Sequence, residues 1–321
     1  MASGIPFASA MMGVASQKQV SGDHVALNSS FSSGVNSGSK KQVIDWSYGH
    51  KPLFCIAYID PGIEVQKGQE AEVAKYPIAL VPQDNRLRFR RWRDKVRRLN
   101  PDIKLLAYQM VIEETGIPGP GHELMRTLED PWVRYPGGII PTVTFATNVS
   151  GKRKRIFDPR RELWQQAFIQ ACQSTLASDD YDGLFLDQCT VYNKAALDPR
   201  VKREMLNALG ATLDTLRSTL PNELIIGNSH YSWPALNGEM NENRPKRAAK
   251  EFLIDARRKV PRMELFHKYY RDGETSDELK DYFNLALKNK AFFGCALNAQ
   301  TARWLPMFDQ VLANYEIVSG G

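Results

Sequence analysis

Short apolar runs alternate with longer amphipathic segments through most of this chain, and this alternation limits the folds that it can adopt. The runs lie at residues 53–59, 77–81, 103–110, 183–187, 223–228, 235–240, 264–270 and 291–297. Continuous apolar runs of this length are typical of strands that are buried on both faces. Strands that alternate with helices form right-handed crossovers in a parallel sheet. About eight such strands over about 275 residues predict an α/β fold of the (β/α)8 TIM-barrel type.

Amphipathic segments between the runs carry apolar residues at helical spacing. Their stripes are Phe89, Trp92, Val96 and Leu99; Trp164, Phe168, Ala171 and Thr175; and Met205, Leu209, Leu213, Leu216 and Leu220. A further helix is expected to begin near Thr275, because Thr275 and Glu278 have the spacing of a capping box ahead of another apolar stripe.

Composition divides the chain near residue 45. Residues 1–45 are rich in Ser and Gly and show no sustained periodicity, so we expect a flexible N-terminal tail ahead of a barrel domain over 46–321. The segment around 111–160 contains GIPGPG and YPGG and is expected to be an elaborated loop region. The first residues lack the positive charge that precedes the apolar part of a signal peptide. The sequence leaves a secreted, a surface-associated or another location open.

The composition excludes several classes of site and partner. Four cysteines lie far apart in the sequence, without the spacing of a zinc site, a redox motif or a disulfide framework. No apolar run reaches the roughly 20 residues that span a bilayer. The net charge of +6 favours acidic partners only weakly. We therefore expect no metal, no cofactor and no membrane span, and the sequence does not indicate an oligomeric state.

The stretch YDGLFLDQ, at residues 181–188, carries an apolar strand directly into the carboxylate of Asp187. A buried charge is costly unless it has a partner or a function. In a barrel of this type, functional groups gather at the C-terminal ends of the strands and in the loops that follow. Asp187 is therefore the first candidate for a catalytic group, although capping a helix or pairing with an arginine would also explain it.

Other polar residues follow the remaining runs. They are Asp60, Asp84, Gln109, Asn228, His230, Glu239, Glu242 and His267. Two carboxylates that face one cavity suit the cleavage of glycosidic bonds, in which one protonates the leaving oxygen while the other attacks the anomeric carbon or activates water. We assign Asp187 as nucleophile or base and Glu242 as general acid. The remaining carboxylate of the same segment, Glu239, is the next candidate for the acid.

Residues around this pair are expected to bind substrate. They are Asp60, Asp84, Gln109, Trp132, Asn228, His230, Trp233 and Glu239. Several have equally ordinary structural explanations: Asp60 and Asp84 suit turns, a lone His230 suits scaffolding, and Trp132 and Trp233 suit the anchoring of loops as well as stacking on a sugar.

The order YDGLFLDQ, LIIGNSH and ALNGEMNEN resembles the hypothetical glycosyl hydrolase group of barrels, which is distantly similar to polygalactosaminidase-type and alpha-amylase-like barrels. In that pattern an Asp-Gly strand ends in aspartate, as Asp182-Gly183 to Asp187 do here. A later Asp-Gly segment brings a glutamate, which matches Glu242, although Asn237 stands where aspartate is usual. The resemblance implies a glycosidase fold and an oligosaccharide or polysaccharide substrate, and the departure at Asn237 leaves an inactive relative open.

Two alternatives belong to other functional classes. The segment RLRFRRWRDKVRR, at residues 86–98, could contact nucleic-acid phosphates or an acidic polysaccharide. Its apolar stripe accounts for a buried helix face, however, which leaves the arginines as the exposed face of an ordinary helix. The second alternative is a barrel that binds glycan without cutting it, in an adhesive or virion-associated assembly to which residues 1–45 attach it.

Overall fold

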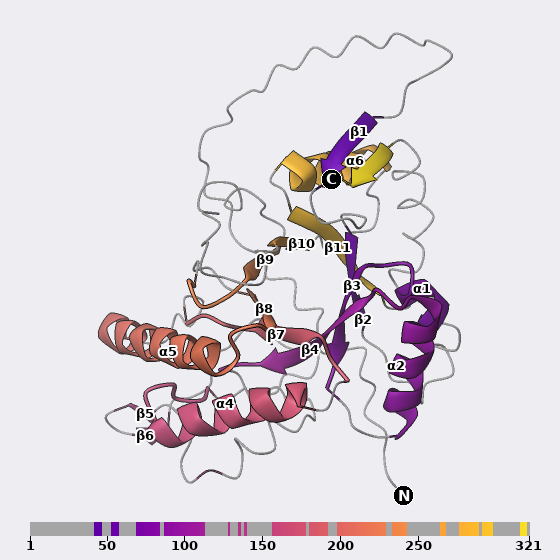
Figure 1. Cartoon of the computed structure of the whole chain (residues 1–321). Helices are drawn as coiled ribbons and strands as arrows, with labels where there is room; N and C mark the ends of the chain where they lie inside the picture. The colour runs from indigo at the N-terminus through magenta and orange to yellow at the C-terminus, as the bar shows by residue number, and fades with distance from the viewer. Residues whose placement is uncertain are drawn as a thin grey trace, which may run out of the picture.

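The computed structural model describes residues 42–46, 53–57, 69–83, 87–112, 128, 134–135, 138–139, 156–177, 180–191, 198–228, 233–242, 264–267, 276–288, 291–297 and 315–319 (Figure 1). Residues 1–41 of the predicted tail and most of the predicted loop region around 111–160 lie outside these ranges.

Parallel strands form the central sheet. They are β2 (Leu53–Ala57), β3 (Ile78–Pro82), β4 (Lys104–Met110), β7 (Gly183–Asp187), β8 (Leu224–Asn228), β9 (Gly238–Glu242), β10 (Glu264–His267) and β11 (Ala291–Leu297). The strand order is β10–β11–β2–β3–β4–β7–β8–β9, and the pairing of β9 with β10 closes it. The predicted α/β class with a parallel sheet is confirmed.

The described helices lie between these strands in the chain. They are α1 (Gln69–Val73), α2 (Leu87–Leu99), α4 (Glu162–Leu176), α5 (Pro199–Thr219) and α6 (Ser276–Lys288). Helices α4 and α5 contact each other next to β4 and β7 (Figure 1). Their predicted apolar stripes are buried, apart from Leu220, which is half-buried just beyond the end of α5.

The stripe predicted for α2 is wrong at one position. Leu99 is 54% exposed at the end of the helix, whereas Arg93 is buried to 2% exposure in the middle of it. Arg93 Nη2 forms an ion pair with Asp180 at 2.8 Å, and Nη1 donates to the Tyr181 hydroxyl at 3.0 Å. A buried guanidinium is tolerated because these partners lie directly before β7 and receive it.

Two small sheets lie outside the central one. Strand β1 (Gln42–Trp46) pairs in parallel with β12 (Tyr315–Ser319), and β5 (Arg134–Tyr135) pairs antiparallel with β6 (Gly138–Ile139). The boundary predicted at residue 46 therefore falls at the last residue of β1. The four residues before it, which composition grouped with the tail, have strand partners near the C-terminus.

Strand β9 begins three residues later than the apolar run at 235–240 predicts. A turn closes ahead of it, where the backbone N–H of Leu236 donates to the Trp233 carbonyl at 3.0 Å. The side chain of Asn237 then accepts hydrogen bonds from the Ile225 N–H at 2.8 Å and from Arg217 at 2.5 Å. Asn237 thus joins the start of β9 to β8 and α5, at the end of the sheet away from Asp187.

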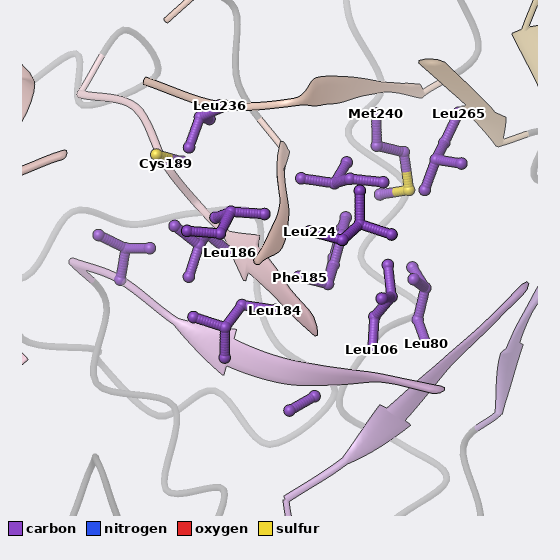
Figure 2. Close-up of a cluster of buried hydrophobic side chains, with 14 of the residues drawn as sticks. Leu80, Leu106, Leu184, Phe185, Leu186, Cys189, Leu224, Leu236, Met240 and Leu265 are labelled. Atoms are coloured by element: carbon purple, nitrogen blue, oxygen red, sulfur yellow. The ribbon is translucent and has the colours of Figure 1, made fainter. Parts of the chain in front are cut away.

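Strand register assigns alternate residues to the two faces of the sheet. Leu80 pairs with Leu106 and Met240 pairs with Leu265, and these side chains gather with Phe185 and Leu224 (Figure 2). All six are buried. They form a close-packed apolar layer below the C-terminal edge of the strands, and a polar group at that edge lies directly above it.

The Asp-Gly pair that opens β7 is structural. Asp182 accepts the Leu105 N–H at 2.8 Å and pairs with Arg97 of α2 at 3.0 Å, which joins β4, β7 and α2 at the N-terminal edge of the sheet. Gly183 then passes so close to β8 that a Cβ atom there would lie 2.2 Å from the Leu224 carbonyl oxygen.

We therefore expect Gly183→Ala to lower the free energy of unfolding by about 3 kcal/mol or more, because the obstacle is backbone rather than a movable side chain. Gly210→Ala is the matched control, since its Cβ would meet only the Trp233 side chain at 3.0 Å and alanine favours the helix by about 1 kcal/mol. Urea denaturation measures both variants. Equal stability of the two would show that the approach of β7 to β8 is not tight.

Candidate functional site

Asp187 lies at the C-terminal end of β7 with 7% of its surface exposed. Its Oδ1 accepts the Asn228 amide at 2.8 Å and the Gln188 backbone N–H at 2.8 Å. Its Oδ2 accepts a hydrogen bond from the Tyr108 hydroxyl. Donors from β4, from β8 and from the turn after β7 therefore converge on one carboxylate, which compensates its burial.

The turn after Asp187 has an unusual backbone. Gln188 has φ of 54°, in the left-handed region that non-glycine residues rarely adopt. The next residue, Cys189, donates its N–H to the Asn228 carbonyl at 3.0 Å and accepts the Trp233 indole N–H at 3.1 Å on its own carbonyl. These bonds hold the turn in the shape that directs the Gln188 N–H to Asp187.

The Cys189 thiol is buried beside this carboxylate. Burial raises the pKa of Cys189 above its ordinary range, and the charge of Asp187 and the nearby Cys172 thiol raise it further. The thiol therefore stays protonated at neutral pH. It packs on the side of β8 where Gly227 lies, and it is not a candidate nucleophile.

Strand register brings five candidate positions to one edge of the sheet. Tyr108 pairs with Phe185, which shares the face of Asp187, and Asn228 pairs with Met240. Two residues beyond Met240 is Glu242, which pairs with His267. By strand alternation, the side chains of Tyr108, Asp187 and Asn228 share the face of the apolar layer, at or near the C-terminal edge. The backbone positions of Glu242 and His267 lie at the same edge, at the ends of β9 and β10.

The structure does not bring Gln109 or Glu239 to this face. Gln109 follows Tyr108 and so has the opposite orientation: its Oε1 accepts the Gln83 amide at 2.9 Å, and Thr175 of α4 donates to Gln83 at 3.3 Å. Glu239 is 4% exposed and pairs in register with Gly227, on the face of β9 opposite to the position of Glu242. Both residues belong to the layer between strands and helices.

Trp233 takes the anchoring role that was the alternative to sugar stacking. Its indole donates to the Cys189 carbonyl, and its ring packs against the position where Gly210 leaves room on α5. Four further candidates, Asp60, Asp84, Trp132 and His230, lie outside the described residues.

Tyr108 is the functional candidate that the sequence reading missed. The apolar run that ends at Met110 drew attention to Gln109 as its polar member, yet alternation places Tyr108 with Asp187. Side chains alternate along a strand, so Tyr108 and Met110 share one face and Gln109 has the other. A tyrosine hydroxyl also requires a hydrogen-bond partner when its ring is buried, and these two facts together could have identified Tyr108.

Several basic residues of helix α2 form ion pairs with acidic residues of the same protein. Arg93 binds Asp180, Arg97 binds Asp182, and Lys95 pairs with Glu70 at 3.2 Å. These intramolecular pairs account for part of the basic stretch that suggested nucleic-acid binding.

The described ranges contain no group of three or more His, Cys, Asp or Glu side chains placed to hold a metal ion. Within the same ranges, no helix has both the length and the apolar character that a membrane span requires.

No protein-family model and no curated protein sequence matches the chain. Solved structures do match it. The glycoside hydrolase domain of PelA from Pseudomonas aeruginosa aligns with a TM-score of 0.50 at 13% identity over 80% of this chain and 95% of that one. A variant of the same domain gives a TM-score of 0.52 at 13% identity over 77% and 95%.

A second kind of neighbour is the GH36 alpha-galactosidase AgaB from Geobacillus stearothermophilus, with a TM-score of 0.51 at 13% identity. The match covers 83% of this chain but only 41% of the galactosidase. At such low identity these likenesses concern the fold. The chain has a barrel fold distantly similar to that of glycoside hydrolases, as the sequence motifs implied.

The left-handed turn yields a test of its own. We expect Gln188→Val to lower the free energy of unfolding by about 1–3 kcal/mol, because a β-branched residue opposes positive φ. The free energy of unfolding of Gln188→Gly should lie within about 1 kcal/mol of the parent value, since glycine adopts this conformation freely. Urea denaturation of the two variants measures the difference, and indistinguishable curves would contradict a left-handed Gln188.

Proposed function

We propose that this protein is a glycoside hydrolase that cleaves glycosidic bonds of an oligosaccharide or polysaccharide with the pair Asp187 and Glu242. The observation that carries the proposal is the setting of Asp187, a buried carboxylate held by three donors at the C-terminal edge of a parallel sheet. We further propose that the complete chain is a (β/α)8 barrel with a helical or loop connection after every strand and a tail over residues 1–41.

Asp187 has the role of nucleophile or base. Hydrogen bonds donated to a carboxylate favour its ionised form, and an ionised carboxylate either attacks the anomeric carbon or removes a proton from the attacking water. The apolar layer beneath it excludes water and strengthens these hydrogen bonds.

Glu242 has the role of general acid, which protonates the leaving oxygen. Two strand spacings of about 4.8 Å and two residues of about 3.3 Å separate its Cα position from that of Asp187, or roughly 12 Å in all. Side chains that extend toward each other across this distance reach the carboxyl separations of about 5–9.5 Å that glycosidases use.

The neighbours support the class of reaction. One neighbour is the glycoside hydrolase domain of PelA and another is the alpha-galactosidase AgaB. Both act on glycosides, and both share this fold at low identity. Asp60, Asp84, Trp132, Asn228 and His230 remain the proposed substrate-binding residues. The structure gives no support to this role for Gln109 and Trp233, whose described contacts are structural, or for Glu239, which is buried on the helix side of β9.

The test begins with the release of reducing ends from a panel of neutral, amino and acidic glycans by the full chain. Asp187→Asn should then reduce turnover of the responding glycan by about 10²–10⁴-fold, because the change preserves shape and removes the reacting charge. Near-parental turnover with a preserved melting temperature would remove Asp187 from the mechanism.

Glu242→Gln should lose turnover to a similar extent, about 10²–10⁴-fold, whereas Glu239→Gln should retain turnover within about threefold. The two variants make the same chemical change three residues apart on opposite faces of β9, so the pair tests the strand register directly. The reverse outcome, with Glu239→Gln inactive and Glu242→Gln active, would make Glu239 the acid.

A second outcome identifies the non-catalytic alternative. If calorimetry detects binding of a glycan that the chain never cleaves, the barrel binds glycan without hydrolysing it, and the proposed activity is wrong.

A further inference from the structure

We propose that Tyr108 and Asn228 are positioning residues that fix the orientation of the Asp187 carboxylate and stabilise its charge, Tyr108 through Oδ2 and Asn228 through Oδ1. The inference deepens the proposed hydrolase function and rests on it for the catalytic consequence. It gives Asn228 a role different from the substrate contact that the sequence suggested.

Both the ring and the hydroxyl of Tyr108 have contacts that fix the side chain. Its ring lies 5.6 Å from the Phe185 ring, centroid to centroid, at an interplanar angle of 43°. Phe185 belongs to the buried layer and is paired with Tyr108 in the sheet register. With the ring fixed against this layer, the hydroxyl reaches Asp187 two residues farther along β7. The hydrogen bond therefore costs little side-chain entropy to form.

Asn228 is fixed through its backbone. Its carbonyl accepts the Cys189 N–H at 3.0 Å, which ties the end of β8 to the turn after Asp187. From this position the side-chain amide donates to Oδ1 at 2.8 Å, beside the Gln188 N–H. Donors on both carboxylate oxygens oppose rotation of the carboxyl group about its Cβ–Cγ bond.

These donors add no charge to the site. A tyrosine hydroxyl and an amide are neutral at ordinary pH, and burial keeps the Cys189 thiol protonated. Among the described strands, register also brings the backbone positions of Glu242 and His267 to the C-terminal edge, two residues beyond Met240 and Leu265. Tyr108 and Asn228 thus stabilise the Asp187 carboxylate by dipoles that are already oriented, without a counter-ion that would compete for it.

The test compares Tyr108→Phe with Tyr181→Phe. Tyr181 is the matched control because its hydroxyl bonds Arg93 and the Pro82 carbonyl instead of the Asp187 carboxylate. Both variants lose one phenolic hydroxyl, so general effects on folding appear in both and are followed by the melting temperature.

The first measurement needs no substrate. In protein labelled with ¹³C at the aspartate carboxyl, the Asp187 signal is assigned by its loss in Asp187→Asn, and its titration midpoint is read from the pH dependence of its shift. We expect Tyr108→Phe to raise this midpoint by about one pH unit or more, because a donor to the charged form is lost. Tyr181→Phe should leave it unchanged.

Asn228→Ala provides a second variant in case Tyr108→Phe fails to fold, and it should move the midpoint in the same direction. An unchanged midpoint in a folded Tyr108→Phe or Asn228→Ala protein overturns the assignment of that residue.

The second measurement is the pH profile of kcat/KM on the glycan that the panel identifies. Tyr108→Phe should lower kcat by about 10-fold to 100-fold with little change in KM, and move the acidic limb of the profile to higher pH. Tyr181→Phe should alter neither. A shifted NMR midpoint in a protein that cleaves no glycan supports the positioning role and refutes hydrolysis, whereas unaltered kcat and acidic limb in an active Tyr108→Phe enzyme overturn the positioning role.

Discussion

The position of β7 between β4 and β8 is the constraint on which the candidate site depends. Its register with β4 puts Tyr108 on the face of Asp187, and its register with β8 brings Asn228 to the same carboxylate. A slip of one residue in either pairing would turn these side chains to the helix layer. Gly183 permits the pairing of β7 with β8, because only a residue without a side chain fits so close to Leu224.

The polar residues at the two ends of the sheet have different partners, which matches a separation of stability from the proposed chemistry. At the N-terminal edge, Asp182 joins β4 to α2, and Asn237 with Arg217 joins β8, β9 and α5. At the C-terminal edge, Asp187 gathers donors from three segments and leads into a turn with positive φ. This division is usual for parallel barrels, in which polar groups at the C-terminal edge carry the chemistry. It also explains how asparagine serves at 237, where the motif that the sequence resembles has aspartate: its amide oxygen accepts the bonds that this joint requires.

The sequence located Asp187, the parallel strands and the helices, because each depends on a local pattern. An apolar run identifies a buried strand, and a carboxylate at its end identifies a position at the sheet edge. The same local patterns did not predict the orientation of Gln109 and Glu239 or the exposure of Leu99. Polar character alone does not reveal which face of a strand a residue occupies, and the stripe in α2 does not reveal that an ion pair to Asp180 buries Arg93.

By itself, the sequence determined the class of fold and the carboxylate on which the proposed chemistry depends, since both follow from the order of apolar and polar residues along the chain. Only the tertiary structure decided which neighbours serve that carboxylate. Tyr108 and Asn228 are 79 and 41 residues from Asp187 in the chain, and their contacts with it exist only once β4, β7 and β8 pair in this register. The physical reason is that side-chain alternation is local, whereas strand register is set by pairing between distant segments.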